Sequence, residues 1–173
     1  MFLAWGRLYG AMPRVIAGDV AGLPESLAAH TVIQGTGYQS PGILTDLAET
    51  QHAAGQLAEA RATVAAALQI SAQLGQPFTD VDLHRLDGDL VLATGGAPEE
   101  AASRYQHALE IARSQEAKSL ELRAATSLAK LWRDQGKRTE ARALLADIYN
   151  WFTEGFDTAD LKDAKALLDE LGV

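Results

Sequence analysis

Apolar residues recur along this chain at intervals of three and four positions, which is the spacing of one face of an α-helix. The β-branched residues are scattered and show no alternating run that would predict a strand. The clearest stripes comprise Leu44, Leu47 and Ala48; Leu83, Leu86, Leu90 and Val91; and Leu122, Ala125, Leu128, Ala129 and Trp132. The pattern therefore predicts an all-α fold.

A second pattern, made of small residues, returns about every forty positions. Ala60, Ala101 and Ala141 lie 41 and 40 residues apart, and a glycine stands five positions before each of them. A fixed period of this length is typical of stacked helical pairs. Small residues also occur twelve or thirteen positions earlier, at Ala48, Gly88 and Ala129. We expect the two sets to meet where the helices of a pair cross closely.

Glycine-containing breaks divide the chain into repeated units. Gly35–Gly42 and Gly75–Phe78 are predicted to separate successive pairs. The expected units are 1–39, 40–78, 79–118 and 119–156, followed by a capping helix at 157–171. The first unit is degraded, with residues 2–11 as its first helix and Asp19 in place of the expected small residue. Phe152, Phe156 and the capping helix are expected to close the last pair, because a terminal repeat otherwise leaves an apolar face in water.

Composition narrows the functional classes. The 173 residues are consistent with one domain, and the absence of cysteine excludes disulfides and thiolate metal ligands. The absence of cysteine also fits a cytoplasmic location. A net charge of −8 argues against nonspecific binding to nucleic acid or to an anionic membrane. The apolar start has no basic region before it, so we expect a segment of a longer protein rather than a signal peptide.

The small and large positions resemble the tetratricopeptide repeat, a helix–turn–helix unit of about 34 residues. The matching residues are Leu47, Ala48, Gly55, Ala60 and Ala67 in one unit; Gly88, Ala101, Tyr105 and Ala108 in the next; and Leu128, Ala129, Gly136 and Ala141 in the third. This resemblance implies a right-handed superhelix of antiparallel helix pairs. The longer period and the displaced closing proline imply longer helices or connectors than usual.

A narrower resemblance covers the distal half. The segments 84–92, 108–115, 117–132 and 151–161 resemble the C-terminal repeats of large bacterial signalling proteins. Those proteins carry an adenylate/guanylate cyclase or DNA-binding regulator domain, followed by a STAND-like ATPase module. The sequence has no glycine-rich loop ending in Lys-Ser/Thr and no strands for metal-binding aspartates. The resemblance therefore implies a non-catalytic interaction or regulatory module without a cofactor.

Other candidate sites have ordinary structural explanations. Four histidines, His30, His52, His84 and His107, show no convincing metal-ligand register. Asp82, Asp87 and Asp89 are typical of a solvated helix face, because only two of them share a side of the helix. We therefore predict neither a metal site nor catalytic residues.

The first helices of the pairs are predicted to form an inner face that runs from acidic to basic. Its residues are Thr45, Glu49, His52, Arg85, Asp89, Arg123, Thr126, Lys130 and Arg133. We expect a protein or peptide partner, or another domain of the same chain, to place acidic groups against Arg123, Lys130 and Arg133. A homodimer is also consistent with the sequence. A solvated face without a partner, and a standalone small-molecule sensor or enzyme that uses this groove, remain open alternatives.

Overall fold

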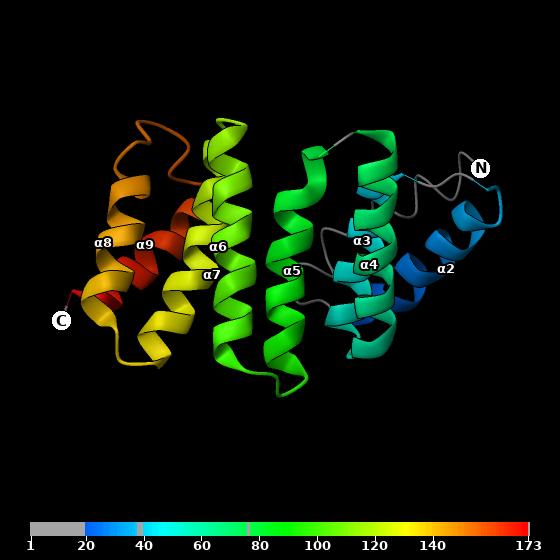
Figure 1. The fold of residues 1–173 in the computed structure, drawn as a ribbon, viewed down its shortest axis with the longest axis horizontal. Helices are drawn as coiled ribbons and strands as arrows, with labels where there is room; N and C mark the ends of the chain where they lie inside the picture. Colours follow the sequence, from blue (N-terminus) through cyan, green and yellow to red (C-terminus); the bar gives the residue numbers. More distant parts are fainter. Residues whose placement is uncertain (1–19, 38–39, 76, 173) are drawn as a thin grey trace.

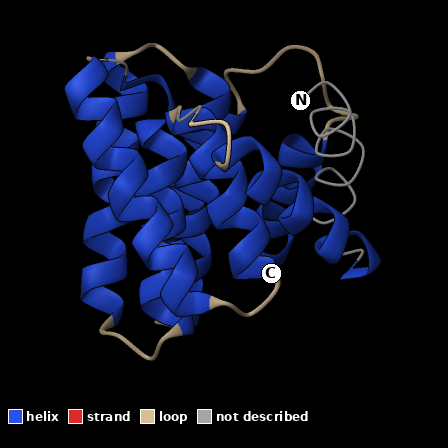
Figure 2. Ribbon diagram, turned by 90° about the vertical axis from the view of Figure 1, so that its right-hand side faces the viewer, coloured by secondary structure: helices blue, strands red, loops and turns tan. Residues whose placement is uncertain are grey.

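The computed structural model describes residues 20–37, 40–75 and 77–172. Within these ranges the chain is helical and contains no strand, which confirms the all-α prediction (Figure 2). Eight α-helices and two 3-10 turns make up this part: η1 (Val20–Gly22), α2 (Leu23–Gln34), α3 (Pro41–Ala53), α4 (Leu57–Leu74), η2 (Pro77–Thr79), α5 (Asp80–Ala93), α6 (Pro98–Ser114), α7 (Lys118–Asp134), α8 (Arg138–Tyr149) and α9 (Ala159–Leu171). The predicted first helix at 2–11 and Asp19 lie outside the described residues. No helix in the described ranges is long and apolar enough to span a membrane.

The helices stand side by side in a row, from α2 at one end to α8 and α9 at the other (Figure 1). Short turns join α3 to α4, α5 to α6 and α7 to α8, and the helices within each pair pack against each other. Neighbouring pairs also touch, because α5 contacts both α3 and α7, and α7 contacts α9. The helices α3, α5, α7 and α9 therefore follow one another along one side of the array.

Local sequence explains where the helices begin and end. The turns inside the pairs contain left-handed glycines, such as Gly55 (φ 74°) and Gly136 (φ 79°), a conformation that other residues adopt at a cost. Helix α3 starts earlier than the predicted break at 35–42 suggested. Ser40 caps it by accepting a hydrogen bond from the Ile43 backbone amide at 3.3 Å. Because α3 begins at Pro41, Gly42 lies in the first turn of this helix and not in the connecting loop.

The helix crossings use the small residues that the repeat predicted. Ala60, Ala101 and Ala141 are completely buried, and so are Ala48 and Ala129 on the facing helices. The remaining crossing is tighter still, because the Tyr105 ring of α6 lies directly on Gly88 of α5. A Cβ atom at Gly88 would fall 2.5 Å from Tyr105 Cε1. The small residues therefore set the approach of the two helices within each pair.

Helix α5 joins the two halves of the apolar core. Leu83, Leu86 and Leu90 belong to a cluster with residues of α3 and α4. Val81 and Val91 belong to the larger cluster that continues through α6, α7 and α8 to α9. The core is thus continuous along the array through this single helix.

Helix α9 covers the far end of the array. Its apolar stripe of Leu161, Ala164, Leu167 and Leu171 is buried, as the capping prediction required. Phe152 packs against the same core. Phe156 contributes less than expected: its ring is 47% exposed and lies 5.9 Å from the Tyr149 ring. The cap consists mainly of α9 itself.

The Gly88–Tyr105 crossing can be tested by adding one methyl group. Gly88→Ala should destabilise the protein by about 1–3 kcal/mol through overpacking, although alanine is the better helix former. The Tyr105 side chain is 1% exposed and belongs to the larger core cluster, so moving it away from a new methyl group would disturb this packing. Thermal denaturation should show a lower melting temperature, by roughly 2–4 °C per kcal/mol for a chain of this size.

The matched control is Gly42→Ala in α3. A Cβ atom there would meet only Thr79 Cγ2, at 3.9 Å, which is an ordinary contact. This substitution should therefore be neutral or stabilising by up to about 1 kcal/mol. If both glycine variants change the melting temperature in the same direction, the tight crossing is not what constrains Gly88.

Candidate functional site: a charged inner face

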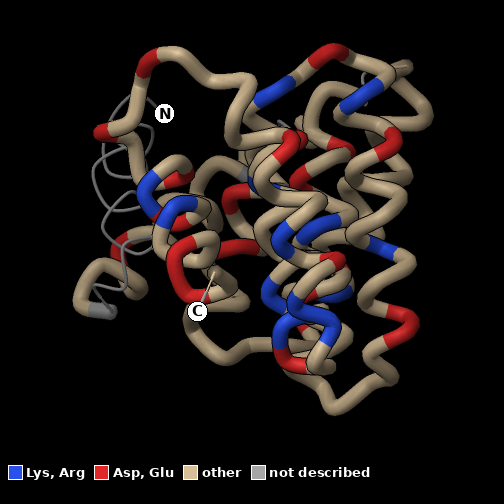
Figure 3. The backbone as a smooth tube through the Cα atoms, turned by 90° about the vertical axis from the view of Figure 1, so that its left-hand side faces the viewer, with Lys and Arg blue, Asp and Glu red and all other residues tan. Residues whose placement is uncertain are grey.

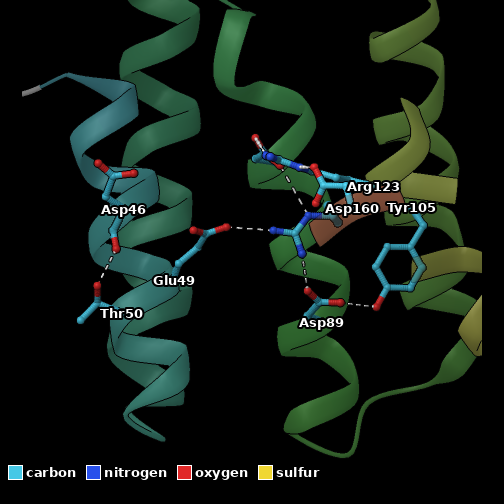
Figure 4. A network of polar contacts seen from close by, with 9 residues as sticks. Asp46, Glu49, Thr50, Asp89, Tyr105, Arg123 and Asp160 are labelled. Atoms are coloured by element: carbon cyan, nitrogen blue, oxygen red, sulfur yellow. Dashed lines mark hydrogen bonds and ion pairs between the residues drawn. The ribbon is translucent and has the colours of Figure 1, made fainter. Parts of the chain in front are cut away.

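A network of charged side chains crosses the first helices of successive pairs (Figure 4). It begins at Glu49 on α3, passes through Arg85 on α5 and Arg123 on α7, and ends at Asp160 on α9. We call the side of the molecule formed by α3, α5, α7 and α9 the inner face. Glu49, Arg85, Arg123 and Asp160 follow one another at intervals of 36 to 38 residues. Glu49 thus pairs with Arg85, Arg123 pairs with Asp160, and Asp82 pairs with both arginines.

Arg85 is the centre of this network. Its side chain is 18% exposed and pairs with three carboxylates: Glu49 at 2.9 Å, Asp89 at 2.9 Å and Asp82 at 3.5 Å. Burial acts to lower the pKa of Arg85, but Asp89, Glu49 and Asp82 raise it on balance. The hydroxyl of Tyr105 donates a hydrogen bond to the second oxygen of Asp89 at 2.7 Å. The arginine is therefore held as a permanent cation between two helix pairs.

Arg123 carries the network to the end of the array. Its Nε donates to Asp160 on α9 at 2.7 Å, and its Nη1 lies 3.7 Å from Asp82 on α5. Arg123 is less buried than Arg85, with 44% of its side chain exposed. Solvent screens exposed ion pairs, so these contacts orient the guanidinium more than they stabilise the fold.

Acidic groups outnumber cations at the α3 end of the inner face. Asp46 is half-buried, and its pKa is raised to about 7 by burial and by the charges of Glu49 and Asp82. Burial also raises the pKa of Glu49, although Arg85 opposes this shift. No hydrogen bond or ion pair holds the Asp46 carboxyl group within the described residues. Asp46 is thus a destabilised anion in the folded protein.

An open cavity of about 260 Å³ lies at the centre of the inner face. It is lined by Glu49, Arg85, Arg123, Thr126, Ser127, Lys130, Asp160 and Asp163. Three of these side chains are cationic and three are anionic, so their formal charges cancel. Ligand pockets for drug-sized molecules span roughly 300–1,000 Å³, and this cavity is smaller. Its size suits a single side chain or a molecule of similar dimensions.

The predicted inner-face residues differ in what they present to solvent. Thr45 and Thr126 are buried, and each donates its hydroxyl hydrogen to a backbone carbonyl of its own helix at 2.9 and 2.8 Å. His52 is half-buried and has no ion-pair partner in the described ranges. Lys130 is exposed and forms no ion pair with any residue that the structure describes. Among the predicted inner-face lysine and arginine residues, Lys130 is therefore the one without an ion pair in the described part of the chain.

The expected acidic-to-basic gradient is largely neutralised by the chain itself. Arg133 pairs with Asp134 at 2.8 Å and with Glu170 of α9 at 3.0 Å. Figure 3 shows basic and acidic positions interspersed along the helices at this end of the molecule. The gradient prediction counted the cations of α7 but not the carboxylates that α9 places beside them. A partner would compete with these internal pairs at Arg123 and Arg133.

Sequence reasoning did not assign five residues to this site. Asp46, Ser127 and Asp163 were not predicted, because nothing in the sequence around them shows that they approach the network. Asp82 was considered only for catalysis, and Asp160 was not assigned to the inner face. The 37-residue interval from Arg123 to Asp160 is close to the interval from Glu49 to Arg85, and this regularity was an available signal.

Two of the histidines contact each other, and a third is buried. The His84 and His107 rings touch edge to face, with centroids 4.5 Å apart, and burial together with His107 lowers the pKa of His84. His30 is 1% exposed, and its Nδ1 lies 2.9 Å from the Ser26 carbonyl oxygen. No group of three or more histidine, aspartate or glutamate side chains in the described ranges is arranged to hold a metal ion.

Comparison with known proteins defines the fold further. No protein-family model and no curated protein sequence matches the chain. Among solved structures, the chain is similar to the crystal structure of BtubC (BKLC) from P. vanneervenii. The two share 18% sequence identity with a TM-score of 0.61, over 98% of this chain and 87% of that chain. At this level of identity, the likeness shows a common fold and leaves the function to be argued from the site.

The raised pKa of Asp46 predicts a pH-dependent effect of Asp46→Asn. Between about pH 4 and pH 7 the folded state keeps a proton that the unfolded chain, with a pKa near 3.8, has lost. Wild-type stability should consequently fall as the pH rises through this range. Above pH 7 the Asn variant should be more stable by about 1–2 kcal/mol, after allowance for solvent screening at this half-buried site.

The measurement is urea denaturation of both proteins at several pH values. The difference in unfolding free energy should shrink towards zero as the pH falls below the unfolded-state pKa of 3.8, because Asp46 is then protonated in both states. A stabilisation that is constant from pH 4 to pH 8 would show that the carboxyl charge is not the cause.

Proposed function

We propose that this chain is a non-catalytic interaction module built from tetratricopeptide-like helix pairs arranged as a right-handed superhelix. The inner face would receive a protein or peptide segment. Three observations support this proposal: the order of the pairs along the array, the small residues at their crossings, and the fold shared with BtubC. Arrays of this kind typically present an extended surface to a partner.

The observation that carries the proposal is the state of the side chains around the cavity. Glu49 and Arg85 pair with each other, as do Arg123 and Asp160. Lys130 on α7 has no partner among the described residues, and the cavity beside it is open. An acidic group of a partner would therefore meet Lys130 first. Arg123 could join that contact, because only its Nε and Nη1 are engaged within the described ranges.

The surroundings of the module are proposed on sequence resemblance alone. The distal repeats resemble those of bacterial cyclase- or ATPase-linked signalling proteins, so we place this chain in a larger cytoplasmic regulator of that type. In such a protein the partner can be another domain of the same chain. The chain itself would supply contacts and relay a signal, without turnover of its own.

A catalytic or sensing role has one observation in its favour. The pKa of Asp46, about 7, lies in the range that suits a general base. Asp46 is not among the residues that line the inner-face cavity, however. An interaction role explains why Lys130 at the cavity has no ion pair in the described residues. A catalytic role for Asp46 does not explain this.

The proposal is tested by capture of partners from a lysate of the source organism, with the purified chain as bait. Lys130→Glu should weaken capture by about fivefold or less, the effect of one exposed ion pair, and raised salt should weaken it too. Arg61→Glu is the matched control, because Arg61 is exposed on α4 and forms no ion pair within the described ranges. Arg133 is unsuitable, since reversing its charge also breaks the contact with α9.

Two results would contradict the proposal. Equal capture by the Lys130 and Arg61 variants would place the interface away from the inner face. Turnover of ATP, or synthesis of a cyclic nucleotide, by the purified chain would show that it is an enzyme. Circular dichroism of both variants verifies that the helices are intact.

A further inference from the structure

Two opposite charges remain unpaired on facing walls of the inner-face cavity. Lys130 projects from α7 and Asp163 from α9, and both line the cavity. Neither forms an ion pair with any residue in the described ranges, and they do not pair with each other. The remaining charges at the cavity are taken up by the Glu49–Arg85 and Arg123–Asp160 pairs. The cavity therefore presents one free positive and one free negative group.

The helical spacing of the lining residues gives each wall of the cavity one kind of polar group. Arg123, Ser127 and Lys130 are spaced by four and three residues, so they share one face of α7. Asp160 and Asp163 share one face of α9 for the same reason. The two helices pack against each other. The α7 wall thus offers cationic and hydroxyl donors, and the α9 wall offers carboxylate acceptors.

The hydrogen-bonding capacity of both walls is incompletely used. The Ser127 hydroxyl is half-buried and has no hydrogen-bond partner among the described residues. Asp160 uses only its Oδ2 atom for Arg123, which leaves Oδ1 available to another donor. A ligand that carried only one sign of charge could pair with the opposite charges on one wall. Its charge would then lie near a group of the same sign on the other wall.

We propose that this cavity binds a zwitterionic group. Its carboxylate would be held by Lys130 and Ser127, and its ammonium or guanidinium group by Asp163 with Asp160. This inference rests on the proposed function, because it specifies the chemistry that the inner face recognises. Two sources can supply such a group: a free amino acid, or neighbouring acidic and basic side chains of a protein segment. The cavity volume of about 260 Å³ is consistent with either source.

The first test compares three small probes with a four-carbon chain that differ in the charged groups they carry. The probes are 4-aminobutyrate, which is zwitterionic, butyrate, which is anionic, and butylamine, which is cationic. Each is titrated into ¹⁵N-labelled protein while the amide signals of α7 and α9 are followed by NMR. We expect 4-aminobutyrate to bind about two- to fivefold more tightly than either singly charged probe, since it adds a second exposed ion pair.

Two substitutions assign the charges to their walls. Lys130→Gln should abolish the advantage of 4-aminobutyrate over butylamine, and Asp163→Asn should abolish its advantage over butyrate. Lys162→Gln is the control, because it removes a charge from the neighbouring position of α9 without altering a residue that lines the cavity. The control should keep the preference for the zwitterion.

A second probe distinguishes the sources. The peptide acetyl-Gly-Lys-Glu-Gly-amide carries adjacent opposite charges and no charged ends. Shifts caused by the peptide but not by 4-aminobutyrate would support the inference with a protein segment as the source. Shifts caused by 4-aminobutyrate, with an affinity that falls in the Lys130 and Asp163 variants, would support it with a small molecule as the source.

Other outcomes would overturn the inference. Equal affinity for 4-aminobutyrate and butyrate would mean that the cavity is a simple anion site. Absence of shifts in α7 and α9 with every probe would mean that it binds no such group. If Lys130→Glu still impaired partner capture in that case, the proposed function would stand and only the zwitterion inference would fail.

Discussion

The inner face depends on keeping one arginine charged in a largely buried position between two helix pairs. Arg85 lies where α3 meets α5, and removing it would leave Glu49, Asp82 and Asp89 close together without this cation. An uncompensated charge in such a place costs several kcal/mol. The position of α3 relative to α5 is therefore restricted to arrangements in which Glu49 can reach Arg85. The cavity and its free charges lie beside this fixed point.

Packing within the pairs supports this arrangement. Because Gly88 has no side chain, the Tyr105 ring can pack closely against α5, and its hydroxyl then reaches Asp89. Asp89 in turn is held next to Arg85. A small residue at a helix crossing thus contributes to the orientation of the largely buried Arg85–Asp89 pair. Gly88 and Asp89 both lie on α5 and both contact Tyr105 of α6. Displacement of α6 would therefore disturb the hydrogen bond to Asp89 at the inner face.

The sequence made the helices and their buried crossings predictable, because helical spacing and side-chain size are local properties. Ala60, Ala101 and Ala141 are buried as their period indicated. The partners of the charged residues were less accessible, since they depend on how each helix is rotated relative to the next pair. Arg133 shows the difference: its place on α7 could be predicted, whereas its pairing with Glu170, 37 residues later, required the packing of α9. The pKa of Asp46 likewise depends on Asp82, which lies on another helix pair.

A double-mutant cycle between Arg85 and Glu49 tests most directly whether this ion pair holds the two helix pairs in register. Free energies of unfolding would be measured by urea denaturation for Arg85→Met, Glu49→Gln and the double variant. Arg85→Met alone should cost about 2–4 kcal/mol, because three carboxylates lose their cation. In the Glu49→Gln background the cost should be smaller by about 1 kcal/mol or more, which would be a measurable coupling energy. Additive effects of the two substitutions would contradict the account, because they would show that the contact across the pairs contributes nothing to their arrangement.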